Sequence, residues 1–352
     1  MRKMQDGMHA HLVLEDGTLF RGRSVGSPGT AAGEICFTTA MAGYEEAVTD
    51  PSYAGQVLVF SYPLVGNYGT DPSRRESSRA QTRGVVMRRV RPAWAAWLAD
   101  EGVPALDDVD TRALVRRIRT EGAMRCALGT AEPDELRRLA LSEPSLAGQT
   151  LAAEAGTPVP FRFGSGPRVV VLDLGCKRSI LRRLAESGLQ AVVVPPTTPA
   201  DEILALDPAA VLVSNGPGDP AAAADQVETV AALVGRVRLF GICLGHQLVA
   251  LALGMRTFKL PFGHRGANHP VRERGSSRVL VTTQNHGYAV EASDAAEVSH
   301  LSLNDATVEG LESEDVTTLQ FHPEAAPGPL DALPFFDRIA AACRSAPTFA
   351  AS

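Results

Sequence analysis

Uninterrupted apolar runs that alternate with helical patterns dominate the chain from Arg168 onward. A helical pattern around Ile180, Leu181 and Leu184 separates the first two of these runs. The runs lie at 169–172, 191–194 and 211–213. Strands that are apolar at every position are covered on both faces, as in parallel sheets. We therefore predict an α/β fold from Arg168 to the C-terminus, with a parallel sheet between layers of helices.

The first half of the chain has a different pattern, with short apolar segments bounded by Gly, Pro and Asn. These segments predict strands at 10–14, 56–60 and 82–87. A helix is predicted from Asp110 to Arg119, because Asp110 or Thr111 can cap it and Leu114, Val115 and Ile118 form an apolar face. The first half is therefore predicted to be β-rich, with some helix.

The segment 152–167 is rich in Pro, Gly and small residues and has no periodicity, which is typical of a linker. We therefore predict a β-rich α+β domain over 1–151, a linker over 152–167 and the parallel-sheet α/β domain over 168–352. The length of 352 residues also favours two domains.

Composition and charge exclude several classes of protein. The net charge of -6 and the pI near 5.8 leave no excess of Lys and Arg for binding nucleic acid. No apolar stretch reaches the roughly 18 residues of a membrane helix. Asp6, His9 and His11 interrupt the N-terminal segment where a signal peptide would be apolar, so we expect a cytoplasmic protein. The five cysteines are widely separated and are expected to be reduced.

A reactive cysteine is indicated where an apolar run ends in Gly241-Ile242-Cys243-Leu244-Gly245 and a helical stretch follows. Glycines two before and two after the cysteine are typical of a nucleophile elbow, a tight turn from strand to helix. The helix N-terminus favours thiolate over thiol, and its backbone N–H groups can receive an oxyanion. Taken alone, the pattern fits a buried cysteine packed between two glycines equally well.

A base and an orienting carboxylate follow a second strand-like run, 316–321. His322 and Glu324 are two residues apart, so in an extended chain both side chains lie on one face. The carboxylate can then orient the imidazole that deprotonates the thiol. Each residue alone fits a structural role, but together with Cys243 they predict a Cys-His-Glu triad.

A third element is the turn Ser214-Asn215-Gly216-Pro217-Gly218 after the run 211–213. Backbone N–H groups of Gly216 and Gly218 could join that of Leu244 in stabilising a tetrahedral intermediate. A tight turn without a chemical role is the alternative interpretation of this loop.

In order and spacing, the three elements resemble the class I (triad) glutamine amidotransferase family over about 168–336. The resemblance implies hydrolysis of glutamine through a γ-glutamyl thioester, with Cys243 as nucleophile, His322 as base and Glu324 as its orienter. Segments around Gly43–Tyr53, Tyr62–Gly69, Phe258–Val271 and Thr283–Val290 resemble the small, glutamine-hydrolysing subunits of carbamoyl-phosphate synthases, as does the helix from Asp110.

That resemblance covers nearly the whole chain and implies a glutamine pocket made by Ser52, Gly216, Gly218, Leu244, Gln247, Asn285, Gly287 and Tyr288. It also implies a large subunit as partner, which makes carbamoyl phosphate from bicarbonate and ATP for arginine and pyrimidine biosynthesis. Tyr288 and Cys176 depart from the family pattern, which has Phe and a small or apolar residue there; Cys176 is interpreted as a packing cysteine.

No phosphate-binding glycine motif occurs in the chain, so ATP and Mg²⁺ are expected on the partner subunit and no cofactor in this chain. No metal is predicted, because His246, His264, His269 and His286 lack the spacing of a recognised metal site. Two alternatives stay open: a glutaminase subunit of another synthase, and a non-catalytic regulatory subunit.

Overall fold

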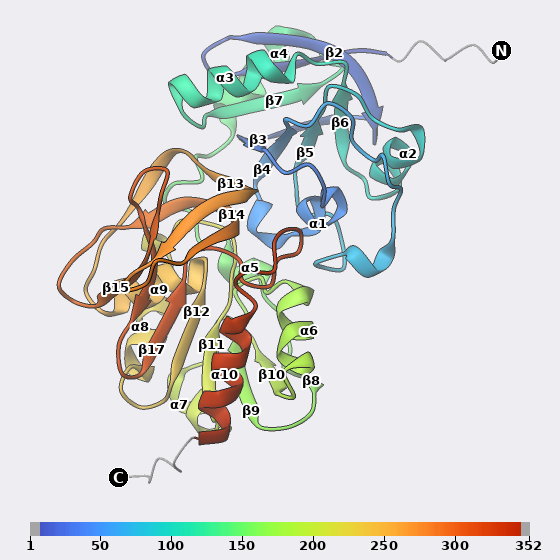
Figure 1. The fold of residues 1–352 in the computed structure, drawn as a ribbon. Coiled ribbons are helices and arrows are strands. Elements are labelled where there is room, and N and C mark those ends of the chain that lie inside the picture. The colour runs from blue at the N-terminus through green and yellow to red at the C-terminus, as the bar shows by residue number, and fades with distance from the viewer. Residues whose placement is uncertain (1–7, 346–352) are drawn as a thin grey trace. The chain divides into compact units, whose positions relative to one another are not determined.

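The computed structural model describes residues 8–345 and divides them into two units (Figure 1). One unit comprises the residues up to Leu146 together with 261–265, and the other comprises 147–260 and the residues from Gly266 onward. Residues 1–7, part of the segment predicted to lack an export signal, lie outside the described residues. Between residues 8 and 345, no helix is long and apolar enough to cross a membrane.

Seven strands of the first unit close into a barrel in the order β1-β2-β6-β5-β4-β3-β7. The strands are β1 (His9–Leu14), β2 (Leu19–Gly26), β3 (Thr30–Thr38), β4 (Gln56–Phe60), β5 (Gly84–Val86), β6 (Pro104–Asp107) and β7 (Arg125–Gly129). The strands predicted at 10–14, 56–60 and 82–87 correspond to β1, β4 and β5, which confirms the β-rich first half.

Helices and short 3₁₀ turns connect the barrel strands. They are α1 (Tyr44–Thr49), η1 (Pro51–Tyr53), η2 (Pro72–Arg74), α2 (Pro92–Asp100), α3 (Thr111–Glu121) and α4 (Pro133–Ser142). The predicted helix is α3, and Asp110 is its cap because the Asp110 side chain accepts a hydrogen bond from the Ala113 N–H. Leu114 and Ile118 are buried in the barrel core, as the apolar periodicity requires.

The second unit contains a ten-stranded sheet in the order β14-β13-β15-β16-β17-β12-β11-β9-β10-β8. Its strands are β8 (Phe161–Gly164), β9 (Arg168–Leu172), β10 (Gln190–Val194), β11 (Ala210–Val213), β12 (Leu239–Ile242), β13 (Thr257–Glu273), β14 (Val279–Val290), β15 (Glu297–Ser302), β16 (Val308–Glu312) and β17 (Val316–Leu319). The central pairs β10–β9, β9–β11, β11–β12 and β12–β17 are all parallel. The predicted parallel α/β sheet is confirmed, and an antiparallel extension continues it beyond β17.

Helices cover both faces of this sheet. They are α5 (Ala152–Ala155), α6 (Arg178–Glu186), α7 (Ala200–Ala205), α8 (Ala224–Leu233), α9 (Leu244–Ala252) and α10 (Pro334–Ser345), with η3 (Pro220–Ala222) before α8. Alternate residues of β9 enter two separate cores: Val169 and Val171 pack with α6 and α10, and Val170 and Leu172 pack with α7, α8 and α9. The strands are apolar at every position because both of their faces are buried.

The segment 152–167 differs from the prediction of a linker. It contains α5 and β8, and β8 pairs antiparallel with β10 at the edge of the sheet. β8 has only four residues, Phe161-Arg162-Phe163-Gly164, and all four are exposed, so its short apolar-polar alternation was not distinguished from the Pro- and Gly-rich sequence around it. The domain boundaries themselves stay a prediction.

Candidate active site

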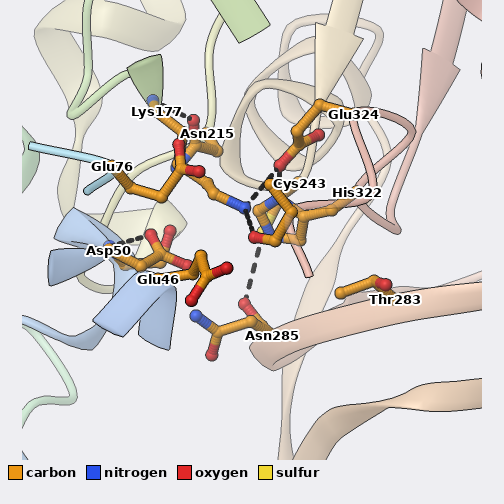
Figure 2. Close-up of polar contacts among 12 residues, drawn as sticks. Glu46, Asp50, Glu76, Lys177, Asn215, Cys243, Thr283, Asn285, His322 and Glu324 are labelled. Atoms are coloured by element: carbon orange, nitrogen blue, oxygen red, sulfur yellow. Dashed lines mark hydrogen bonds and ion pairs between the residues drawn. The ribbon is translucent and has the colours of Figure 1, made fainter. Parts of the chain in front are cut away.

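Cys243 lies between the end of β12 and the start of α9, where parallel strands of an α/β sheet place their functional loops (Figure 2). Its backbone has φ 55° and ψ -103°, a strained conformation for a residue other than glycine. Two backbone hydrogen bonds hold the turn: Cys243 N–H donates to Leu319 O over 2.9 Å, and Gly245 N–H donates to Ser214 O over 3.0 Å. The neighbouring strands therefore fix the elbow that the sequence predicted.

The flanking glycines are required by close backbone contacts. A Cβ atom on Gly245 would lie 2.0 Å from Val213 O, and one on Gly241 would lie 2.9 Å from the Gly245 carbonyl carbon. Since both obstacles are backbone atoms, no side-chain rotation can relieve them. The Gly-x-Cys-x-Gly pattern thus reflects the packing of α9 against β11 and β12.

His322 and Glu324 contact each other as predicted, but not through an extended strand. β17 ends at Leu319, His322 forms an isolated bridge to Thr283, and Glu324 lies in the turn that follows. His322 Nδ1 donates to Glu324 Oε1 over 2.7 Å. The turn, and not the two-residue period of a strand, brings the carboxylate to the imidazole.

Cys243, His322 and Glu324 are all buried, with 2%, 1% and 0% exposure. Burial by itself lowers the pKa of His322, but the Glu324 carboxylate and the Cys243 side chain outweigh it and raise that pKa to about 10. Burial raises the pKa of Glu324, but Lys177 and His322 more than reverse this and hold it below its ordinary value. Glu324 is therefore held as a carboxylate, and its charge stabilises the protonated form of His322 once the ring has accepted a proton.

Lys177 is a fourth buried residue of this cluster, and the sequence analysis missed it. Its ammonium donates to Glu324 Oε1 over 2.8 Å and to Ala326 O over 2.7 Å. Its backbone N–H donates to Asn215 Oδ1 over 3.1 Å, which ties the loop after β9 to the loop after β11 (Figure 2). One signal was available: the chain has only three lysines, and this one lies in the loop that follows the buried strand β9.

Two of the sequence-predicted pocket residues of the second unit, Asn285 and Gln247, contact Cys243. The Cys243 thiol donates to Asn285 O on β14 over 3.6 Å. Gln247, one turn into α9, donates through Nε2 to Tyr288 O over 2.9 Å and to Gln320 Oε1 over 3.1 Å. The Gln247 side chain therefore binds the backbone of β14 at Tyr288. The helical spacing of Gln247 from Cys243 did not predict this contact.

The remaining predicted residues occupy loops and the first unit. Gly216 packs against Leu174, since a Cβ there would lie 2.1 Å from Leu174 O, and Gly218 has φ 106° next to Gln149 and Leu151. Leu244 is the first residue of α9, so its N–H has no partner within the helix. Gly287 lies in β14. Ser52 lies in η1 of the first unit, and its approach to Cys243 stays a prediction.

His246 belongs to the support of the elbow. It is fully buried, and a 2.8 Å hydrogen bond joins its Nδ1 to Thr318 Oγ1 on β17. Burial lowers the pKa of His246 to about 3, so the ring is neutral. Cys176 is half-buried and packs against the core that contains α6 and α10, as its interpretation as a packing cysteine requires.

Comparisons with known proteins match both parts of the chain. Residues 170–342 match the family model of glutamine amidotransferase class-I, and residues 12–128 match that of the carbamoyl-phosphate synthase small chain, CPSase domain.

Similar curated proteins include carbamoyl phosphate synthase small chains of Methanopyrus kandleri and Symbiobacterium thermophilum. The first is 46% identical over 96% of this chain and 99% of the relative, and the second is 47% identical over 93% and 97%. A carbamoyl phosphate synthase pyrimidine-specific small chain of Lactiplantibacillus plantarum is 44% identical over 94% of each chain. With its Cys-His-Glu cluster and these matches along nearly its whole length, the chain belongs to the carbamoyl phosphate synthase small chain family.

Proposed function

We propose that the chain hydrolyses L-glutamine to glutamate and ammonia and delivers the ammonia to a carbamoyl phosphate synthase large subunit. That partner would use ATP, Mg²⁺ and bicarbonate to make carbamoyl phosphate. The observation that carries the proposal is the strained elbow of Cys243 beside a buried His322–Glu324 pair. An activated thiol at a helix N-terminus is the arrangement that attack on an amide carbon requires.

In the proposed reaction, His322 takes the proton of Cys243, and the thiolate attacks the side-chain amide carbon of glutamine. Backbone N–H groups of Leu244 and of the Gly216–Gly218 loop would stabilise the oxyanion of the tetrahedral intermediate. His322 then returns the proton to the leaving nitrogen, which departs as ammonia and leaves a γ-glutamyl thioester. Water, deprotonated by His322, hydrolyses the thioester to glutamate and restores the thiol.

Glu324 would keep His322 in position and stabilise its protonated form during both steps. Support comes from the 2.7 Å hydrogen bond and from the raised pKa of His322. The amino-acid end of glutamine is proposed to contact Asn285, Gly287 and Tyr288 on β14, with Ser52 as a further contact. Gln247 would act on this pocket through its hydrogen bond to the Tyr288 carbonyl.

Both uses of carbamoyl phosphate, arginine and pyrimidine biosynthesis, are proposed for the product, in the cytoplasm where ATP is available. One similar protein carries a pyrimidine-specific name, which supports the pyrimidine branch in particular. A strain that lacks the chain should require arginine and a pyrimidine together. A requirement for a pyrimidine alone would restrict the proposal to that branch.

The proposed chemistry is tested by Cys243→Ser. Glutamate release from glutamine should disappear, while synthesis of carbamoyl phosphate from added ammonia by the assembled complex should continue. Acid quenching of the wild type, followed by mass spectrometry, should reveal a γ-glutamyl adduct on Cys243. Undiminished glutamate release by the variant would contradict the assignment, and co-purification with a different ATP-dependent synthase would replace the proposed partner.

A further inference from the structure

Strand β14 presents two different sets of side chains, because successive residues of a strand point to opposite faces. Asn285 and Gly287 alternate with Gln284 and His286 along the strand. Gln284 and His286 are 2% and 5% exposed, so the side of β14 away from Asn285 carries buried polar groups in place of apolar ones. Buried polar side chains persist where hydrogen bonds satisfy them.

A continuous series of hydrogen bonds joins these groups to Glu309 on β16. Gln284 Nε2 donates to Glu309 Oε2 over 2.8 Å, and Gln284 Oε1 lies 2.8 Å from His286 Nε2. The other ring nitrogen, His286 Nδ1, lies 2.7 Å from the carbonyl oxygen of Tyr288. Glu309 is fully buried, and the series therefore leads from a buried carboxylate to the backbone of the proposed glutamine pocket.

The Tyr288 carbonyl also accepts a hydrogen bond from Gln247 Nε2 over 2.9 Å. Gln247 lies on α9, the helix that begins directly after Cys243. One carbonyl oxygen is thus held from two directions, by the nucleophile helix through Gln247 and by β16 through Gln284 and His286. The position of β14 relative to the thiol depends on both contacts.

Hydrogen-bond chemistry explains why the series ends in a carboxylate. Both ring nitrogens of His286 face carbonyl-type oxygens, which only accept, so both nitrogens must donate and the ring must be an imidazolium. If the Gln284 amide is turned over, the imidazole is neutral and Glu309 must carry the proton instead. In both arrangements His286 and Glu309 together carry one more proton than a neutral His286 and an ionised Glu309 would carry.

We propose that Glu309 is a positioning residue for glutamine binding, which acts through Gln284 and His286 on the 285–288 segment. Through its hydrogen bond with the Gln284 amide, Glu309 fixes the orientation of the His286 ring, which donates from Nδ1 to the Tyr288 carbonyl, and so holds the pocket in register with Cys243. The inference rests on the proposed function and adds to it a group that does not touch the substrate. Replacing the carboxylate by an amide of the same shape removes the charged acceptor of the Gln284 Nε2 hydrogen bond and so weakens the first contact of the series.

The test compares the full-length wild type with Glu309→Gln and with Gln284→Met, which interrupts the series while leaving the carboxylate. Loss of one hydrogen bond to a charged group should raise KM for glutamine by about tenfold, with kcat changed by less than about twofold. A second readout uses 6-diazo-5-oxo-L-norleucine, a glutamine analogue that alkylates the nucleophile only after its amino-acid end is bound. Its labelling of Cys243 at low concentration should slow by about tenfold in both variants, whereas labelling by iodoacetamide should not change.

Glu312→Gln is the matched control, because Glu312 lies on the same strand and pairs with Arg338 at the surface, where the two side chains are 42% and 44% exposed. It should leave KM and both labelling rates unchanged. Unaltered KM and analogue labelling in Glu309→Gln and Gln284→Met would overturn the inference. So would equal slowing by both reagents, which would indicate general damage to the site. A wild type that neither releases glutamate nor reacts with the analogue would instead overturn the proposed function itself.

Discussion

Replacement of Lys177 by Met is the most informative perturbation of the buried cluster. The ammonium and the Glu324 carboxylate are 2.8 Å apart, with side chains 2% and 0% exposed. Removing one partner of a buried ion pair leaves an uncompensated charge and destabilises a protein by about 3–5 kcal/mol. At about 2–4 °C for each kcal/mol in a domain of this size, the midpoint of thermal unfolding should fall by about 6–20 °C.

The loss of stability expected for Lys177→Met depends on the charge of Glu324. The pKa of Glu324 therefore determines how this loss changes with pH. The pKa of Glu324 in the folded protein is below its ordinary value, so the stability it contributes is present above the unfolded pKa and is lost as pH falls through the folded one. The difference between the wild type and Lys177→Met, measured by urea denaturation, should therefore be largest near neutral pH and shrink as the solution is acidified.

A double-mutant cycle separates the ion pair from simple packing. In a Glu324→Gln background the Lys177–Glu324 ion pair is already lost, so adding Lys177→Met should destabilise the protein much less than it does in the wild type. Arg178→Met is the matched control, because Arg178 is the exposed neighbour in the chain and should change stability by less than about 0.5 kcal/mol. Equal destabilisation by Lys177→Met in both backgrounds would refute the attribution of the effect to the Lys177–Glu324 ion pair.

Three further predictions follow from the same structure. Gly245→Ala should prevent formation of the elbow, because its Cβ would lie 2.0 Å from the Val213 carbonyl oxygen, and should abolish both soluble expression and glutamate release. Asp110→Ala should lower the free energy of unfolding by about 1 kcal/mol, because the cap to the Ala113 N–H is lost, without changing KM. The pKa of His322 is raised to about 10 in the folded state, against about 6.5 in the unfolded state. The difference in free energy of unfolding between the wild type and His322→Asn should therefore be largest below about pH 6.5 and disappear as pH rises to about 10. A difference that urea denaturation finds constant with pH would refute this.

The parallel sheet and the elbow at Cys243 could both be predicted from the sequence, and for the same physical reason. The strands β9, β10, β11 and β12 are buried on both faces, so every position is apolar, and the backbone contacts at Gly241 and Gly245 tolerate no other residue. Burial on both faces and close backbone contacts each restrict the residue type at a single position, so the amino-acid sequence alone reveals them. By contrast, β8 is a four-residue edge strand whose side chains are all exposed, so burial imposes no requirement on its residues.

The supporting contacts of the candidate site could not be predicted, because each joins residues far apart in the chain. Lys177 meets Glu324 across 147 positions, and His246 meets Thr318 across 72. No local sequence pattern links Lys177 to Glu324 or His246 to Thr318, because both contacts depend on the order of the strands in the sheet. The His322–Glu324 pair was predicted for a partly wrong reason, since a turn and not an extended strand brings the two side chains together.

The division of the sheet gives the site two parts with different chemical tasks under the proposed function. The carboxyl ends of the parallel strands β9, β11, β12 and β17 lead to the charged cluster and the thiol, whose interactions change as bonds form and break. The antiparallel strand β14 supplies the amide and backbone groups proposed to hold the amino-acid end of glutamine, which does not react. Interactions that change only in the transition state alter kcat, whereas uniform binding alters KM. Substitutions around the parallel edge, such as Lys177→Met, should therefore lower kcat, whereas those behind β14, such as Glu309→Gln, should raise KM, and a variant of either group with the opposite behaviour would contradict this division.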